Sequence, residues 1–293
     1  PIPDSAFEQV LVNYGIDSEG TVDGQILTAD AAAVGGTLSM INDGITNLSG
    51  IEAFINITGL NVSYNTGITS LDLTSNTLLQ TLDTEGCSSL GTLTVTGLAN
   101  LTSLHLYGNA LTALDVSTNA LLESLNVRNN QISILDLSVN GAFTSLECRG
   151  NDMTSLDMRN GNNVNVVTFN SDFNNNLTCI FVDDASAGYL SGWTKDILST
   201  FVNDEVECNT LNIENMTSNT FNIYPNPAKG SIHISSNIST STVEVYSITG
   251  KRLISKELTF GENRLDISSL SSGVYLARFS HEEQSITKKL IVD

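Results

Sequence analysis

Apolar side chains recur in a fixed order along most of this chain. The copies begin at residues 35, 57, 79, 101, 122, 143 and 164, so the spacing is 22 residues three times and then 21 residues three times. In the clearest copy the recurring positions are Leu101, Leu104, Leu106, Asn109, Leu111, Leu114 and Val116. The last copy is weaker and keeps Val164, Val167, Phe169 and Asp172. Short apolar alternations that stop at Asn or Gly indicate brief strands rather than long helices.

The order L-x-x-L-x-L-x-x-N is the pattern of leucine-rich repeats. One such turn cannot bury its own apolar side, whereas stacked turns bury a continuous row of Leu, Ile and Val. We therefore expect a β-rich, leucine-rich-repeat solenoid over residues 35–172, with each x-L-x-L-x stretch pairing with the next turn. The copy over 79–100 is degenerate, and we expect irregular stacking there.

Asn occupies the ninth position in four copies and predicts a ladder of buried amides. An amide can satisfy backbone groups that the bend leaves unpaired. The Asn residues are Asn65, Asn109, Asn130 and Asn151, and Cys87 and Asp172 replace them in two copies. Cys148 stands at an inward Leu position, which predicts a buried thiol.

Acidic residues also repeat, in the second half of the turns, at Asp72, Asp115, Asp136 and Asp157. They are compatible with a calcium stripe or with a solvated face on which each carboxylate accepts nearby backbone N–H groups. We favour the second, because calcium sites converge several oxygens from one tight loop. Residues 17–24 resemble half of a calcium-binding loop, but Thr28 stands where the bidentate acid belongs, so no metal is expected.

Both ends of the solenoid depart from the repeat. Residues 1–34 predict an N-terminal cap with a helix over 5–14, whose shared face carries Phe7, Val10, Leu11 and Tyr14. Residues 173–211 predict a C-terminal cap with a last strand over 177–182 and an aromatic cover that includes Trp193 and Phe201. A Cys179–Cys208 disulfide is expected to close this cap.

Charge divides the chain near residue 220. The net charge of the whole chain is −20, but residues 1–220 hold 4 Lys/Arg against 25 Asp/Glu, a balance of −21, and residues 221–293 hold 8 against 7. An acidic body argues against nucleic acid and against an anionic membrane surface. No apolar run in the sequence is long enough to span a bilayer.

Residues 212–220 are polar and aperiodic and predict a linker. Seven short alternating runs follow it and predict an antiparallel β-sandwich over 221–293. They are 221–224, 231–235, 242–247, 251–255, 263–267, 273–279 and 285–292.

Four motifs in this last part resemble the type A C-terminal sorting domain of the Bacteroidetes type IX secretion system. Their marker residues are Tyr224, Pro225, Asn226, Pro227, Gly250, Gly273, Tyr275, Lys288 and Lys289. The preceding repeats resemble leucine-rich surface proteins of flavobacteria. The resemblance implies export through the secretion machinery, followed by attachment at the outer surface or release.

Outward strand positions predict a binding surface on the concave face of the solenoid. Its candidate residues are Asp83, Glu85, His105, Tyr107, Asn126, Arg128, Glu147 and Arg149. Tyr and Arg are enriched where binding energy concentrates, and Arg128 lies one turn from Arg149, so Glu147, Glu85 or a ligand must offset their repulsion. The alternative is an ordinary solvated face with internal ion pairs.

No motif of a hydrolase, a metalloprotease or a nucleotide-binding loop is present in the sequence. We therefore expect no catalysis, no cofactor and no metal, and a secreted or surface-attached protein that binds a protein or glycan. The alternatives are a structural spacer at the cell surface and an accessory module of a larger secreted enzyme.

Overall fold

The computed structural model describes residues 1–209, 221–281 and 284–293. These divide into two compact units, Pro1–Cys208 and Asn209–Asp293. The predicted linker over 212–220 lies outside the described residues. Among the described residues no helix is both long and apolar enough to cross a membrane.

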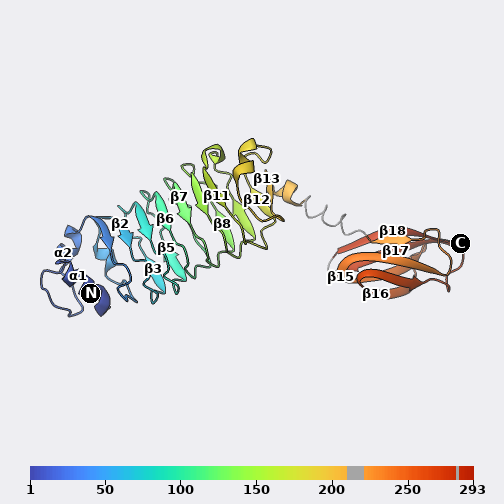
Figure 1. Ribbon diagram of the computed structural model, residues 1–293, viewed down its shortest axis with the longest axis horizontal. Helices are drawn as coiled ribbons and strands as arrows, with labels where there is room; N and C mark the ends of the chain where they lie inside the picture. The colour runs from blue at the N-terminus through green and yellow to red at the C-terminus, as the bar shows by residue number, and fades with distance from the viewer. Residues whose placement is uncertain (210–220, 282–283) are drawn as a thin grey trace. The chain divides into compact units, whose positions relative to one another are not determined.

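The first unit is the expected leucine-rich-repeat solenoid, with parallel strands stacked in chain order (Figure 1). Its main sheet has seven strands: β1 (Gly36–Ser39), β2 (Ile57–Asn61), β4 (Thr81–Asp83), β6 (Ser103–His105), β7 (Ser124–Asn126), β9 (Ser145–Glu147) and β11 (Thr168–Asn170). The central residues Leu60, Leu82, Leu104, Leu125 and Leu146 pair from turn to turn and are all buried. The repeat therefore works as the pattern predicts, because each Leu covers the Leu of the turn before it.

Further parallel strands form on another side of several turns. β3 (Ser70–Asp72) pairs with β5 (Thr92–Thr94), and a four-stranded sheet joins β8 (Ile134–Asp136), β10 (Ser155–Asp157), β12 (Cys179–Phe181) and β13 (Thr200–Val202). The copy over 79–100 stacks in regular register through β4 and β5, so the expected irregularity there is wrong. The interruption falls one turn later, at Leu114–Val116, which form no strand.

Two Asn ladders line the buried bends. At the predicted ladder the Asn130 amide donates to Leu106 O at 2.8 Å and Val127 O at 3.0 Å, and its oxygen accepts from Leu111 N at 3.0 Å. Cys87 fills the same place with a thiol that donates to Val62 O. A second ladder, which we did not predict, contains Asn76, Asn119, Asn140 and Asn163. Each ladder satisfies carbonyl groups that would otherwise be buried without partners.

The register predicted for the last copy is wrong. Leu146 pairs with Phe169, 23 residues away, because a 3-10 turn (η2, Asn163–Asn165) lengthens the connection. Val164 and Val167 are consequently exposed, and Val166, expected to point outward, is buried. Asn174 takes the ladder position that we assigned to Asp172, and donates to Cys148 O and Ser171 O.

The repeating aspartates support turns. Asp72, Asp115, Asp136 and Asp157 each accept the backbone N–H two residues ahead, at 2.9–3.0 Å. This geometry matches the interpretation that we favoured over a calcium stripe. No three His, Cys, Asp or Glu side chains among the described residues are placed to hold a metal ion.

Both predicted caps are present, and each differs from the prediction in its details. Helix α1 (Ser5–Asn13) buries Phe7, Val10 and Leu11, but Tyr14 is 58% exposed and donates to Ser39 O. A second helix, α2 (Thr28–Ala33), and the 3-10 turn η1 (Ile51–Ala53) follow it.

At the other end β13 adds a strand beyond the one that we expected to be last. The 3-10 turn η3 (Gly188–Gly192) precedes Trp193, whose ring stacks on Phe169 with ring centroids 4.2 Å apart. Cys179 and Cys208 form a disulfide.

The second unit is an antiparallel sheet of five strands rather than seven. They are β14 (Asn222–Tyr224), β15 (Ser231–Ser247), β16 (Arg252–Asp266), β17 (Gly273–His281) and β18 (Gln284–Val292). The polar stretches that we took as strand ends lie inside β15 and β16, where the pairing shifts register between Ser236 and Thr240. A bulge bends a strand without ending it, so two predicted pairs merge into two long strands.

Candidate functional site

Outward residues of β2, β4, β6, β7, β9 and β11 of the seven-stranded sheet form three aligned rows, which we call the strand face. The first row is Gly59, Thr81, Ser103, Ser124, Ser145 and Thr168. The second is Asn61, Asp83, His105, Asn126, Glu147 and Asn170. The third is Ser63, Glu85, Tyr107, Arg128, Arg149 and Asp172, and backbone hydrogen bonds from turn to turn hold it in register. The register thus brings together all eight candidate residues.

The second row consists mostly of turn-forming side chains. Four of its six residues accept the N–H two positions ahead, at 3.0–3.2 Å: Asn61, Asp83, Asn126 and Asn170. Asp83 also accepts from the Ser63 hydroxyl at 2.8 Å. Asp83 and Asn126 therefore stabilise turns, a role that was not predicted from the sequence. His105 and Glu147 form no such bond to the residue two positions ahead.

Two arginines of the third row lie against aromatic rings. The guanidinium carbon of Arg128 is 5.4 Å from the ring centroid of Tyr107, and that of Arg149 is 4.4 Å from the ring centroid of Phe173. Among the described residues neither arginine has a carboxylate within 4.0 Å, so the expected compensation by Glu147 or Glu85 is not an ion pair. Arg159, by contrast, contacts Asp157 at 2.5 Å and Glu205 at 2.9 Å.

Two buried polar atoms of the strand face have no partner among the described residues. They are Nε of Arg128 and Oε2 of Glu147. Glu85 is engaged elsewhere, because Tyr64 donates its hydroxyl to Oε1 at 2.7 Å. This hydrogen bond raises the pKa of Tyr64.

A fourth position in each turn has a left-handed backbone. Its residues are Tyr64, Gly86, Gly108, Asn129, Gly150 and Phe173, with φ between 53° and 71°. Glycine adopts this conformation freely, whereas a bulky side chain there costs of order 1–2 kcal/mol. The ring of Tyr64 covers Gly86, where an added Cβ would lie 2.6 Å from it. Bulky rings held at a strained position point to a role beyond folding.

We call Tyr64, Tyr107, Arg128, Arg149 and Phe173 the aromatic–arginine stripe. Tyr64 and Phe173 are 49% and 57% exposed, so their rings are accessible at either end of it. Neither residue was predicted from the sequence, because both stand beside the alternating strand positions. Their signal was an aromatic residue at a position where other turns carry Gly.

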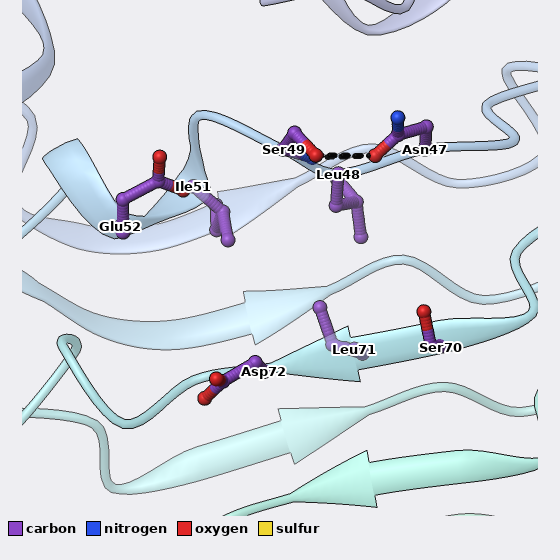
Figure 2. A pocket seen from close by; sticks show the side chains of 8 residues that line it. All are labelled: Asn47, Leu48, Ser49, Ile51, Glu52, Ser70, Leu71 and Asp72. Carbon is purple, nitrogen blue, oxygen red and sulfur yellow. Dashed lines mark hydrogen bonds between the residues drawn. The ribbon is translucent and has the colours of Figure 1, made fainter.

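A separate polar pocket of about 180 Å³ lies where η1 and the preceding loop face β3 (Figure 2). Its carboxylates already have turn contacts: Glu52 accepts Gly50 N at 2.8 Å and Asp72 accepts Thr74 N at 3.0 Å. On the loop before η1, the Ser49 hydroxyl donates to Asn47 Oδ1 at 2.7 Å (Figure 2). None of the candidate residues lines this pocket.

In the second unit, the first and last sorting motifs meet. The Asn226 amide donates to Lys289 O and accepts from Ile291 N, both at 2.8 Å. Tyr224 donates its hydroxyl to Glu262, and Tyr275 donates to Ser271 O.

The remaining sorting residues mark a turn and the ends of strands. Gly250 has a φ of +83° in the turn between β15 and β16, and Gly273 begins β17. Lys288 lies opposite Ala277 in the pairing of β17 with β18. Pro225 and Pro227 follow cis peptide bonds.

Comparisons with known proteins agree with this division. The family model described as a secretion system C-terminal sorting domain matches residues 222–293, the segment that carries the four motifs. A domain of this kind directs its chain to a secretion system, so the protein is secreted or attached to the cell surface. A comparison with curated proteins finds no match.

Solved structures similar to the chain include two internalins of Listeria monocytogenes. Internalin C2 is 24% identical, with a TM-score of 0.42 over 69% of this chain and 94% of its own. InlP is 14% identical, with a TM-score of 0.37 over 100% of this chain and 99% of its own.

Proposed function

We propose that the solenoid is a non-catalytic binding module that presents its strand face to a protein or glycan outside the cell. The C-terminal unit serves as its export address and engages the type IX secretion machinery. One observation carries the proposal: Arg128 and Arg149 have no ion pair among the described residues of a strongly acidic unit, and each lies against an aromatic ring. An arginine that only stabilised the fold would resemble Arg159, which contacts two carboxylates.

The second candidate function is a structural spacer at the surface, and the ladders that stiffen the solenoid favour it. A spacer needs no accessible arginine, so the two functions differ in what the stripe does. The third, an accessory module of a larger enzyme, uses the same face and differs only in what is attached to it.

A capture experiment tests the proposal. The immobilised full chain is exposed to a surface extract and to a glycan panel, beside a variant with Tyr107→Ala, Arg128→Ala and Arg149→Ala. A control with Lys229→Ala and Lys251→Ala also removes two positive charges, but from exposed positions of the second unit. We expect a ligand that the triple variant loses and the control retains. Absence of any ligand, or equal capture by the triple variant, contradicts the proposal and favours the spacer.

A further inference from the structure

We infer that the secretion machinery recognises this chain through an apolar patch on the outer face of the second unit, and that the matching surface of the machinery is apolar with carboxylates at its edge. The patch consists of Tyr246, Ile248, Val274, Leu276 and Ile291, and we call it the outer patch. This inference rests on the proposed export role of the second unit and names the surface that carries out that role.

The strand register places the outer patch on the solvent side of the sheet. Tyr246 lies opposite Leu276, and Val274 lies opposite Ile291. Their neighbours along the same strands are buried in the core: Val245, Ala277, Leu290 and Val292. Because successive side chains of a strand point to opposite faces, these four patch residues point away from the core. Leu276 and Val274 are 41% and 44% exposed, and Ile248, which directly follows β15, is 75% exposed.

The rest of the same face is polar. Glu244 lies opposite Arg278, and Arg278 lies opposite Thr287. The Glu244 carboxylate already has partners, because Arg252 contacts it at 2.6 Å and Tyr246 donates its hydroxyl to it at 2.7 Å. The outer face of an antiparallel sheet is ordinarily polar and solvated. Exposed apolar side chains gathered at one end of it therefore indicate a surface that contacts a partner.

The four sorting motifs meet at the end of the sheet that carries the outer patch. Gly250 lies in the turn that follows β15, and Gly273 begins β17. Lys289 lies directly opposite Leu276. Asn226, from the first motif, donates to Lys289 O at 2.8 Å. A sorting domain acts by being recognised, and the outer patch is an exposed apolar surface that all four of its motifs adjoin.

The charge around the outer patch selects the kind of partner. Lys251 and Lys289 are exposed, and neither forms an ion pair with a residue that the structure describes. Their ammonium groups favour carboxylates at the edge of the partner's surface. A second copy of this chain fits less well, because a two-fold contact pairs the patch with itself and brings the lysines of both copies together.

Export from living cells tests the inference. The full chain, with an added leader that directs it to the periplasm, is expressed in a bacterium that has a type IX secretion system, and the ratio of exported to retained protein is measured. The test variant carries Val274→Glu and Leu276→Glu. The control carries Ser280→Glu and Thr287→Glu, which add the same two charges to the polar part of the same face. Because a carboxylate is costly to bury at an apolar contact, we expect the ratio to fall at least about tenfold in the test variant and to match the parent in the control.

A charge variant makes the test independent of strand packing. Lys251→Glu with Lys289→Glu changes only exposed side chains, so the fold of the sheet is retained. We expect this variant to lower the ratio at least about threefold, because it replaces attraction to the partner's carboxylates with repulsion. Melting curves of the purified variants establish that each is folded, and the charge variant decides the outcome if the test variant is not.

The outcomes separate this inference from the proposed function. Export of folded test and charge variants at the parent's level overturns the inference and leaves the export role standing. A fall in the test variant alone overturns the carboxylate edge. A parent chain that is exported no better than in a strain without the type IX transporter overturns the export role as well. Sedimentation of the parent distinguishes a second copy: a dimer that dissociates in the test variant, with unchanged export, assigns the outer patch to self-association and overturns the inference.

Discussion

The left-handed position in each turn shows how side-chain bulk and backbone conformation compete. Tyr64 and Phe173 occupy left-handed positions where three other turns have Gly. Each ring contacts the neighbouring turn, Gly86 for Tyr64 and Arg149 for Phe173. Local strain of this kind persists where function requires it.

Phe173 allows a direct measurement of that strain. Phe173→Gly and Phe173→Ala remove the same ring, but only Gly relaxes at φ +59°. Part of this gain is offset because Gly loses more backbone freedom on folding, so we expect the Gly variant to be more stable than the Ala variant by about 1 kcal/mol. Urea unfolding of the two variants measures the difference. An Ala variant as stable as the Gly variant shows that the position is unstrained.

Glu8 makes the N-terminal cap sensitive to acid. This carboxylate is 1% exposed; burial by itself raises its pKa, but hydrogen bonds from the N–H groups of Gly24, Asp23 and Gln25 outweigh burial and hold the pKa below the usual 4.5. The stability that its ionised form adds is therefore fully present above about pH 4.5 and is lost as the pH falls through the lower folded-state pKa.

Hydrogen exchange tests this link. At pH 7 we expect Glu8→Gln to weaken the protection of amides 23–25 by about 1–3 kcal/mol, and this difference to shrink toward pH 3 as the parent carboxylate becomes protonated. Glu19→Gln changes an exposed carboxylate nearby and is expected to leave these amides protected. A Glu8→Gln variant with the parent's pH dependence contradicts the assignment.

At the scale of elements, the solenoid is held by contacts between turns, so its ends need separate devices. Asp4 caps α1 through Ala6 N and Phe7 N with one oxygen and accepts from Thr46 and Asn47 with the other. At the other end the disulfide joins β12 to the segment after β13, and Arg159 contacts Glu205 in the same segment. Each device joins a terminal element to a neighbouring part of the solenoid.

The disulfide closes a segment of 29 residues and is expected to contribute about 3 kcal/mol. The double variant Cys179→Ser, Cys208→Ser should lower the melting temperature of the solenoid. In this variant, added reductant should not change the melting temperature further. The parent should fall to a similar temperature when reduced. The thiols of Cys87 and Cys148 are buried and serve as an internal control, since Cys87→Ser should retain the reductant effect. A parent that melts at the same temperature with and without reductant contradicts the prediction.

At the scale of the whole molecule, the two units have separate apolar cores. One core extends from Ile2 to Trp193, and the other from Phe221 to Val292. Units with their own cores unfold as separate cooperative transitions. The charge difference between the two parts of the sequence follows the same division.

Calorimetry of the full chain and of a chain that ends at residue 209 tests this independence. We expect two transitions in the first and one in the second, with the shared transition displaced by less than about 2 °C, since a destabilisation of 1 kcal/mol displaces the melting temperature of a domain of this size by about 2–4 °C. A single transition in the full chain, or a large displacement after truncation, contradicts independent folding.

Periodicity in the sequence determined the solenoid and most of its outward rows, because a repeated turn buries its Leu positions only by stacking and a strand alternates its faces with a period of two. The same regularity aligned Arg128 with Arg149. Motif order determined the sorting domain, since its marker residues stand at fixed places in one short segment.

Tertiary structure decided what depends on contacts between distant turns. A 3-10 turn shifted the last copy, so Asn174 rather than Asp172 completed the ladder, and a shared bulge merged four predicted strands into β15 and β16. Tertiary structure also decided which aromatic ring lies against each arginine. Arg149 contacts Phe173, 24 residues away, and this pairing is set by the backbone conformation of the next turn, which the alternation of apolar and polar residues does not specify.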